Sequence, residues 1–182
     1  VRNFFLQKDN PDFATARLLI DKMIESQPNN NALKTLQQTV RNHTPIAHNS
    51  SVPKFAAYDI NGKQVNNAML AKADTAVVIA WATWNYNSMS MLQTVAQIQK
   101  EKGSNMKVLG VCLDYSRSLC RTALRQRDMN DIPTVCDGKA VDGDVYNRLG
   151  MSNLPDNIVI EKGKVTATGL TLEQLRKKLG KE

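Results

Sequence analysis

The sequence has only two histidines, and it has no long hydrophobic run. Its two histidines, His43 and His48, lie in a polar stretch without acidic or thiol neighbours, so we expect no metal site there. The longest apolar run, Ala76 to Ala82, is far shorter than the ~20 residues that a membrane-spanning helix needs. We therefore expect no membrane span and no metal in this chain.

Cysteine is also scarce. Cys112, Cys120 and Cys136 are three in number and irregularly spaced, which fits neither a disulfide framework nor a zinc site. Cys112 lies in a strand-like segment and Cys120 on an apolar helix face, so we interpret both as small buried hydrophobes. Cys136 ends a short strand before a turn and is the candidate among the three for an accessible thiol, but we favour the interpretation that all three thiols are buried. If segment 132–136 flanks segment 106–113, Cys112 and Cys136 approach each other.

The net charge of +7 invites a nucleic-acid interpretation. Arg117, Arg121 and Arg125 recur on one helical face, but no aromatic residues alternate with them and no nucleic-acid-binding motif is present. A solvated helix face explains this stripe better, and we expect no nucleic-acid partner.

Two parts of the chain differ in pattern. Residues 1–45 are typical of helices, with Asn10-Pro11 as a helix start and Pro28-Asn29-Asn30-Asn31 as a break between two helices. Residues 46–52 are polar and rich in turn formers, and we interpret them as a linker. From residue 53 to 182, strands alternate with helices. We therefore expect an α/β domain with a central mixed sheet between two helical layers, preceded by a small helical segment.

Within 53–182 the elements follow from local signals. Asn61-Gly62 predicts a hairpin, and the apolar runs 75–82 and 106–113 predict strands buried on both faces. Helices are expected at 89–102, 116–127 and 144–149, and a short strand at 132–136. A second hairpin is expected across Lys162-Gly163, and Thr171 to Gln174 is a capping box that opens the last helix.

Four segments in this order carry a family resemblance: "VPKFAAYDINGKQV", "AVVIAWATW", "KVLGVCLD" and "RLGMSNLPDNIVIEKGKV". Together they span about residues 50–182. They resemble the thioredoxin-like fold, and in particular the TlpA/ResA-type thiol-disulfide oxidoreductases and the related redoxin (AhpC/TSA) proteins. The resemblance implies a three-layer thioredoxin-like domain in the periplasm or cell envelope of a bacterium. The chain begins at Val1 and shows no signal peptide, so the expected compartment comes from the resemblance alone.

The family's Trp-Ala-Thr-Trp segment is followed by Cys-x-x-Cys, whose first thiol is activated at a helix N-terminus. Here these positions hold Asn85 and Ser88, so neither half of the disulfide can form. The residues at the family's proton-handling positions are Ile79 and Met91, which cannot carry a proton. The peroxiredoxin loop Pro-x-x-x-Thr-x-x-Cys is absent as well. We therefore expect no catalytic residue and no cofactor at this turn, where Asn85 or Ser88 serves as a helix cap.

One feature of the family's site is present. Leu154-Pro155 matches its cis-proline, beside which an extended polypeptide binds, and Asp156 adds charge to the groove edge. The resemblance implies a groove formed by Trp84, Asn85, Tyr86, Asn87, Leu154, Pro155 and Asp156. We interpret the chain as a redox-inactive domain that binds a polypeptide or an envelope protein, or that serves as a structural module. The alternative is a thiol-disulfide oxidoreductase or peroxiredoxin-like enzyme that uses Cys136, Cys112 or Cys120.

Overall fold

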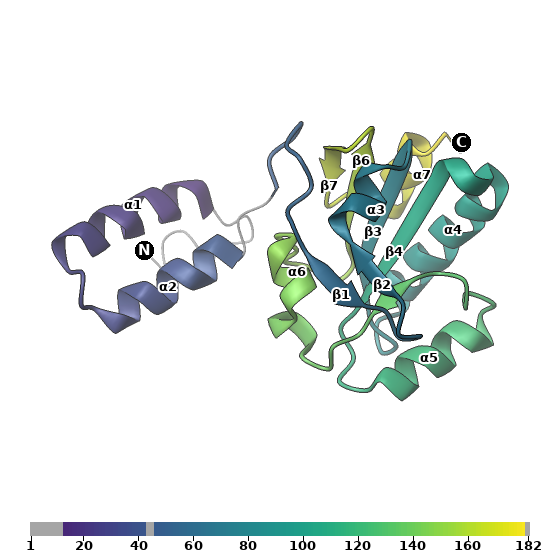
Figure 1. Cartoon of the computed structure of the whole chain (residues 1–182), viewed down its shortest axis with the longest axis horizontal. Coiled ribbons are helices and arrows are strands. Elements are labelled where there is room, and N and C mark those ends of the chain that lie inside the picture. Colours follow the sequence, from purple (N-terminus) through teal and green to yellow (C-terminus); the bar gives the residue numbers. More distant parts are fainter. Residues whose placement is uncertain (1–12, 43–45, 181–182) are drawn as a thin grey trace. The chain divides into compact units, whose positions relative to one another are not determined.

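The structure is a computed structural model that describes residues 13–42 and 46–180. The chain divides into two compact units, Val1–Pro45 and Ile46–Glu182, and each is described by itself (Figure 1).

The first unit is a pair of helices, α1 (Phe13–Ser26) and α2 (Asn31–Asn42). Asn30 begins α2, because its side-chain oxygen accepts hydrogen bonds from the backbone N–H groups of Ala32 and Leu33. A small core of Ala16, Ile20 and Val40 joins the helices. The two expected helices are therefore present, whereas the expected start at Asn10-Pro11 lies outside the described residues.

The second unit begins with a hairpin of β1 (Ala56–Tyr58) and β2 (Gln64–Asn66), which pair antiparallel as the sequence predicts. Gly62 adopts a positive φ of 81° in the turn, where a side chain would be strained. The short helix α3 (Asn67–Ala71) follows at once, capped by the side chain of Asn66. This helix was not expected, since its five residues are too few to show a helical period.

The main sheet has five strands in the order β5-β4-β3-β6-β7. The strands β3 (Thr75–Trp81), β4 (Met106–Cys112) and β5 (Thr134–Val135) are parallel. β6 (Asp156–Glu161) and β7 (Lys164–Thr168) form the second predicted hairpin and run antiparallel to their neighbours. Six of the seven residues of β3 are buried, which explains its continuous apolar sequence.

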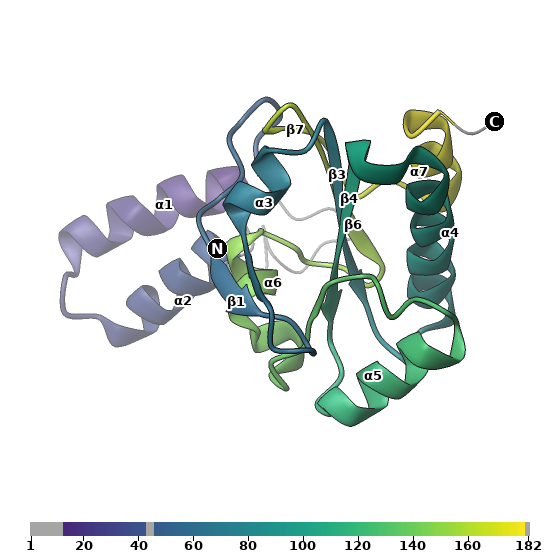
Figure 2. The same cartoon turned by 45° about the vertical axis from the view of Figure 1, so that its right-hand side comes forward.

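Helices cover both faces of this sheet (Figure 2). On one face lie α4 (Tyr86–Lys102), α5 (Arg117–Gln126) and α7 (Leu172–Lys178), over a core that includes Trp81, Leu92 and Leu124. On the other lie α3, α6 (Asp144–Arg148) and the first hairpin, over a second core. Short 3₁₀ turns, η2 (Gly103–Asn105) and η3 (Ala140–Asp142), complete the elements. The predicted α/β architecture with a mixed sheet between two helical layers is confirmed, as is the capping box at Thr171.

The segment 46–52, which we interpreted as a linker, contributes to the second unit. The backbone N–H of Asn49 donates to the carbonyl of Val165 over 2.7 Å, and Val165 donates to Ser50 over 3.0 Å. Val52 is buried in the core. Among the described residues, no helix has the length and apolar character that a membrane crossing requires.

Candidate functional site

The turn between β3 and α4 is a capped helix start. Asn85 has extended backbone, with φ −112° and ψ 102°, and its side-chain oxygen accepts a hydrogen bond from Ser88 N over 2.8 Å. The helix begins at Tyr86, three residues before the expected Met89, because the cap is Asn85 rather than Ser88. Asn85 therefore satisfies a backbone donor where the family places its reactive thiol.

Ser88 has a different structural role. Its side chain is fully buried, its Oγ accepts a hydrogen bond from Ala82 N over 3.1 Å, and it donates to the carbonyl of Asn85 over 2.8 Å. These bonds tie the end of β3 to the first turn of α4. Both functions of this buried hydroxyl are therefore engaged in holding the turn together.

The aromatic residues of the turn face solvent. Tyr86 is 84% exposed and Trp84 is 68% exposed, although both are large and apolar. Asn87 beside them is exposed too. By contrast, the first tryptophan of the segment, Trp81, is fully buried in the core. The two tryptophans thus have opposite roles, one in packing and one on the surface.

The peptide bond between Leu154 and Pro155 is cis, as the resemblance predicts. A hollow of about 370 Å³ lies beside this proline. It is lined by the N-terminal turn of α4, by Pro155 and by the connection from β7 to α7 (Asn87, Ser90, Met91, Pro155, Gly169, Leu170, Thr171 and Leu172). Two residues of the expected groove, Asn87 and Pro155, line this hollow. The wall at 169–172 was missed, because nothing in its sequence marks it as close to the turn.

Asp156 does not charge the edge of a groove, and that expectation is wrong. The side chain is buried, with Oδ2 accepting from Ser152 N over 2.9 Å and from Asn153 N over 3.3 Å. Oδ1 accepts from Asn157 N over 2.8 Å. Burial raises the pKa of this carboxyl above its ordinary value, although the three hydrogen bonds act in the opposite direction. Asp156 shapes the loop that precedes the cis-proline.

The family's proton-handling positions lie in the apolar core. Ile79 is fully buried and Met91 is 3% exposed. The buried polar group beside them is Asn157, which pairs with Ile79 in the sheet register. Its amide donates to the carbonyl of Leu170 over 2.7 Å and accepts from Leu170 N over 3.2 Å. It fixes the 169–172 wall of the hollow and offers no titratable proton.

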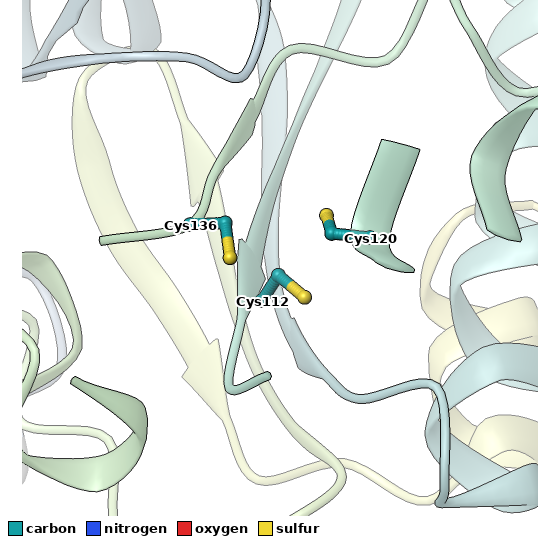
Figure 3. A group of neighbouring side chains, drawn as sticks. All are labelled: Cys112, Cys120 and Cys136. Carbon is teal, nitrogen blue, oxygen red and sulfur yellow. The ribbon is translucent and has the colours of Figure 1, made fainter. Parts of the chain in front are cut away.

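The three cysteines lie together, as Figure 3 shows. Cys112 ends β4, Cys136 follows β5 and Cys120 lies in α5, and their sulfur atoms are all within 4.8 Å of one another. The expected approach of Cys112 and Cys136 is confirmed, whereas that of Cys120 was not foreseen. All three thiols are buried, which confirms the favoured interpretation, and Cys136, at 1% exposed, is not the most accessible of them.

A few polar groups contact this cysteine cluster, which otherwise lies in the apolar core. Cys112 Sγ donates to Asp114 Oδ2 over 3.1 Å, and the same carboxylate accepts from the backbone N–H and the hydroxyl of Thr83. Arg117 Nε donates to the carbonyl of Cys136 over 2.7 Å. A protonated Cys136 donates to the carbonyl of Asp114 over 3.3 Å. Asp114 thus connects the cysteine cluster to the first residues of the β3–α4 turn.

The three thiols share their protons unequally. Hydrogen bonds from Cys112 and Cys120 lower the pKa of Cys136 to about 3, with smaller help from the Gly138 backbone and the Arg117 charge. The pKa of Cys112 is raised, first by its hydrogen bonds to Cys120 and Cys136 and then by burial. The hydrogen bond from Cys112 lowers the pKa of Cys120, but the bond to Cys136 and burial outweigh it and raise the pKa. The negative charge therefore favours Cys136.

No protein-family model matches the sequence, and no curated protein matches it. Solved structures do match the fold. A thiol-disulfide oxidoreductase from Bacteroides fragilis is 24% identical with a TM-score of 0.62, and the match covers 71% of this chain and 97% of that one. The thioredoxin domain of a thiol-disulfide oxidoreductase from Bacteroides vulgatus is 18% identical with a TM-score of 0.60, covering 74% and 99%.

A secreted disulfide oxidoreductase from Mycobacterium tuberculosis, described as homologous to DsbE of E. coli, is 14% identical with a TM-score of 0.58; the match covers 69% of this chain and 93% of that one. Each of these structures is matched along most of its own length. The strand order, the cis-proline and these matches lead to the same conclusion: the chain has the thioredoxin-like fold of the thiol-disulfide oxidoreductases.

Proposed function

We propose that this chain is a member of the thiol-disulfide oxidoreductase family that binds an extended polypeptide and performs no disulfide exchange at its β3–α4 turn. One contrast carries the proposal. The cis-proline and the hollow beside it are present, whereas the two positions of the reactive thiols hold a helix cap and a buried, hydrogen-bonded serine. A bacterial envelope location is part of the same proposal and rests on the family resemblance.

The binding surface that we propose combines the hollow with the exposed aromatics of the turn. A bound strand would pair its backbone with the residue before the cis-proline, as in β-strand addition. Without a covalent intermediate, affinity must come from these hydrogen bonds and from the burial of Trp84 and Tyr86. Burying one such side chain contributes about 1.5–3 kcal/mol, which suits weak and reversible association.

A titration with an unfolded, thiol-blocked polypeptide such as alkylated insulin B chain tests this surface. Tyr86→Ala should weaken binding about tenfold or more, since the contribution of one aromatic side chain corresponds to that factor. Tyr115→Ala is the matched control, because Tyr115 is 81% exposed and lies outside both the β3–α4 turn and the hollow. Equal affinity of the wild type and the Tyr86 variant would exclude this surface.

The same proposal predicts an absence of turnover. The native chain should neither reduce insulin disulfides nor consume peroxide above the rate of the buffer, because positions 85 and 88 carry no thiol. Turnover that disappears in a Cys136→Ser variant would overturn this prediction.

Turnover that depends on Cys136 would favour the second candidate function, which is thiol-disulfide exchange at the cysteine cluster. The low pKa of Cys136 favours it, because the thiolate is the attacking species. Burial opposes it, because all three side chains are 3% exposed or less and a protein disulfide cannot reach them in this conformation.

A further inference from the structure

We infer that Cys112, Cys120 and Cys136 form a binding site for one thiophilic metal ion, and that Cu(I) fits this donor set best. The site is separate from the proposed polypeptide-binding surface and does not depend on it.

Regular secondary structure brings the three ligands together. β4 and β5 pair in parallel through Gly110 with Thr134 and Val111 with Val135, so the next residue of each strand is a cysteine at the same sheet edge. Cys120 lies in the first turn of α5, whose start is fixed by the Ser116 cap. The sulfurs are therefore held by two neighbouring strand ends and a helix, which gives a preorganised arrangement.

The sulfur separations are close to those of a three-coordinate metal thiolate. A metal–sulfur bond of about 2.3 Å places three sulfurs of a trigonal site about 4 Å apart. The three Sγ atoms already lie within 4.8 Å of one another. This upper limit is compatible with the spacing of a trigonal site.

The donor set favours a soft ion with three ligands. Thiolates select Cu(I) and zinc among the common ions, whereas structural zinc almost always takes four ligands. Within the described residues, no histidine or carboxylate joins the three sulfurs as a fourth ligand. The side chains are 1–3% exposed or fully buried and lie in an apolar core, which leaves no ready place for a water ligand. Three sulfurs in a dry site match Cu(I) better than zinc.

The charges around the cluster are compatible with this ion. Loading by Cu(I) replaces the remaining thiol protons, which leave to solvent, and the copper charge offsets part of the negative charge of the thiolates. The cationic side chain of Arg117 is held beside Cys136 by its hydrogen bond to the Cys136 carbonyl. Asp114, which accepts the hydrogen bond of Cys112 in the metal-free protein, lies next to the ligands and is not itself one.

An anaerobic titration of the reduced full chain with Cu(I), in competition with a Cu(I) chelator, tests the site. We expect one Cu(I) per chain and an ultraviolet thiolate-to-copper charge-transfer band. Cys112→Ser, Cys120→Ala and Cys136→Ser should each weaken binding at least tenfold. Val111→Thr is the matched control, because it adds a hydroxyl on the opposite face of β4 and leaves the three sulfurs in place. In the same competition format, zinc should bind at least a hundredfold more weakly.

A second measurement tests the copper site even if one cysteine variant fails to fold. In the wild type, one equivalent of Cu(I) should protect all three thiols from a small alkylating reagent. Absence of stoichiometric binding, unchanged affinity in the folded cysteine variants, or unprotected thiols at full copper loading would each overturn the site. Tyr86→Ala should leave copper binding unchanged, which separates this result from the fate of the polypeptide-binding surface.

Discussion

Placing thiols at positions 85 and 88 tests whether the β3–α4 turn has the geometry of a disulfide-forming site. In an Asn85→Cys/Ser88→Cys variant, one thiol would occupy the N-cap position and the other the first turn of α4. Because Asn85 already has extended backbone and Ser88 helical backbone, we expect the pair to form an intramolecular disulfide on mild oxidation.

The expected stabilities follow from what the substitutions remove. Loss of the Asn85 cap costs about 1 kcal/mol. Loss of the two Ser88 hydrogen bonds leaves the buried N–H of Ala82 without its acceptor and costs about 1–3 kcal/mol, whereas the Asn85 carbonyl keeps its bond from Met89 N. The reduced variant should therefore be about 2–4 kcal/mol less stable than the wild type. Closing a loop of four residues returns about 2 kcal/mol by the chain-entropy relation. The oxidised variant should thus be no more stable than the wild type.

Urea unfolding of the oxidised and reduced forms measures this difference, and peptide mapping after alkylation confirms that the bond joins positions 85 and 88 rather than the native cysteines. One outcome would refute the expected disulfide geometry. If circular dichroism shows a folded protein but the two new thiols stay reduced under oxidant, the backbone of the turn does not suit a disulfide. An oxidised form that clearly exceeds wild-type stability would show that Asn85 and Ser88 contribute less than their hydrogen bonds indicate.

Three further substitutions test the described packing and electrostatics. Asp156→Asn should cost about 1–3 kcal/mol, because an amide cannot accept all three backbone hydrogen bonds. Burial raises the folded-state pKa of Asp156 above its ordinary value of 3.8, so this carboxyl binds more protons in the folded state than in the unfolded state. Its contribution to stability therefore falls as pH rises from below 3.8 through the raised pKa. The stability of the wild type relative to the Asp156→Asn variant, measured by urea unfolding across that pH range, should show this decrease. Gly110→Ala should cost about 1–3 kcal/mol, because the added Cβ would lie 2.7 Å from Thr134 Oγ1 and 2.9 Å from Trp81 Nε1; a smaller loss when Thr134→Ala is added would assign the effect to this contact. Thr171→Ala should cost about 1 kcal/mol in thermal unfolding by removing the α7 capping box, and an unchanged midpoint would contradict that role.

The sequence predicted the elements whose signals are local. The continuous apolar run of β3 and the capping box of α7 each depend on residues that are neighbours in the chain, and both are confirmed. The start of α4 was placed three residues late, because Asn85 and Ser88 are both good caps and only the backbone shows which one caps. The cis-proline followed from the family resemblance, since Leu-Pro by itself predicts a trans bond.

Features that depend on contacts between distant segments were predicted poorly. Burial of Cys112 and Cys120 follows from periodicity, but periodicity cannot show that both meet Cys136, since that depends on strand order and on the angle of α5. Asp156 was expected at the edge of the groove because the resemblance places the residue after the cis-proline there. The loop before it supplies two backbone N–H donors, and these hydrogen bonds offset the free-energy cost of burying the carboxylate. Similarly, the 169–172 wall of the hollow is held in place by a hydrogen bond from the Asn157 amide to the Leu170 carbonyl, and these two residues are distant in the chain.

The turn and the cysteine cluster lie at the same edge of the sheet because parallel strands end there together. β3 runs into Thr83 and the turn, β4 ends at Cys112, and β5 is followed by Cys136. Asp114 joins them, since its Oδ2 accepts from both Thr83 N and Cys112 Sγ. Substitutions at Thr83 and Cys112 therefore share a partner, and their effects on stability should not be treated as additive. In the family, the reactive thiols lie at the turn after the strand that corresponds to β3. In this chain, the cysteines at this edge of the sheet lie at the ends of the neighbouring strands β4 and β5 and in α5, and the buried carboxylate of Asp114 connects them to the β3–α4 turn.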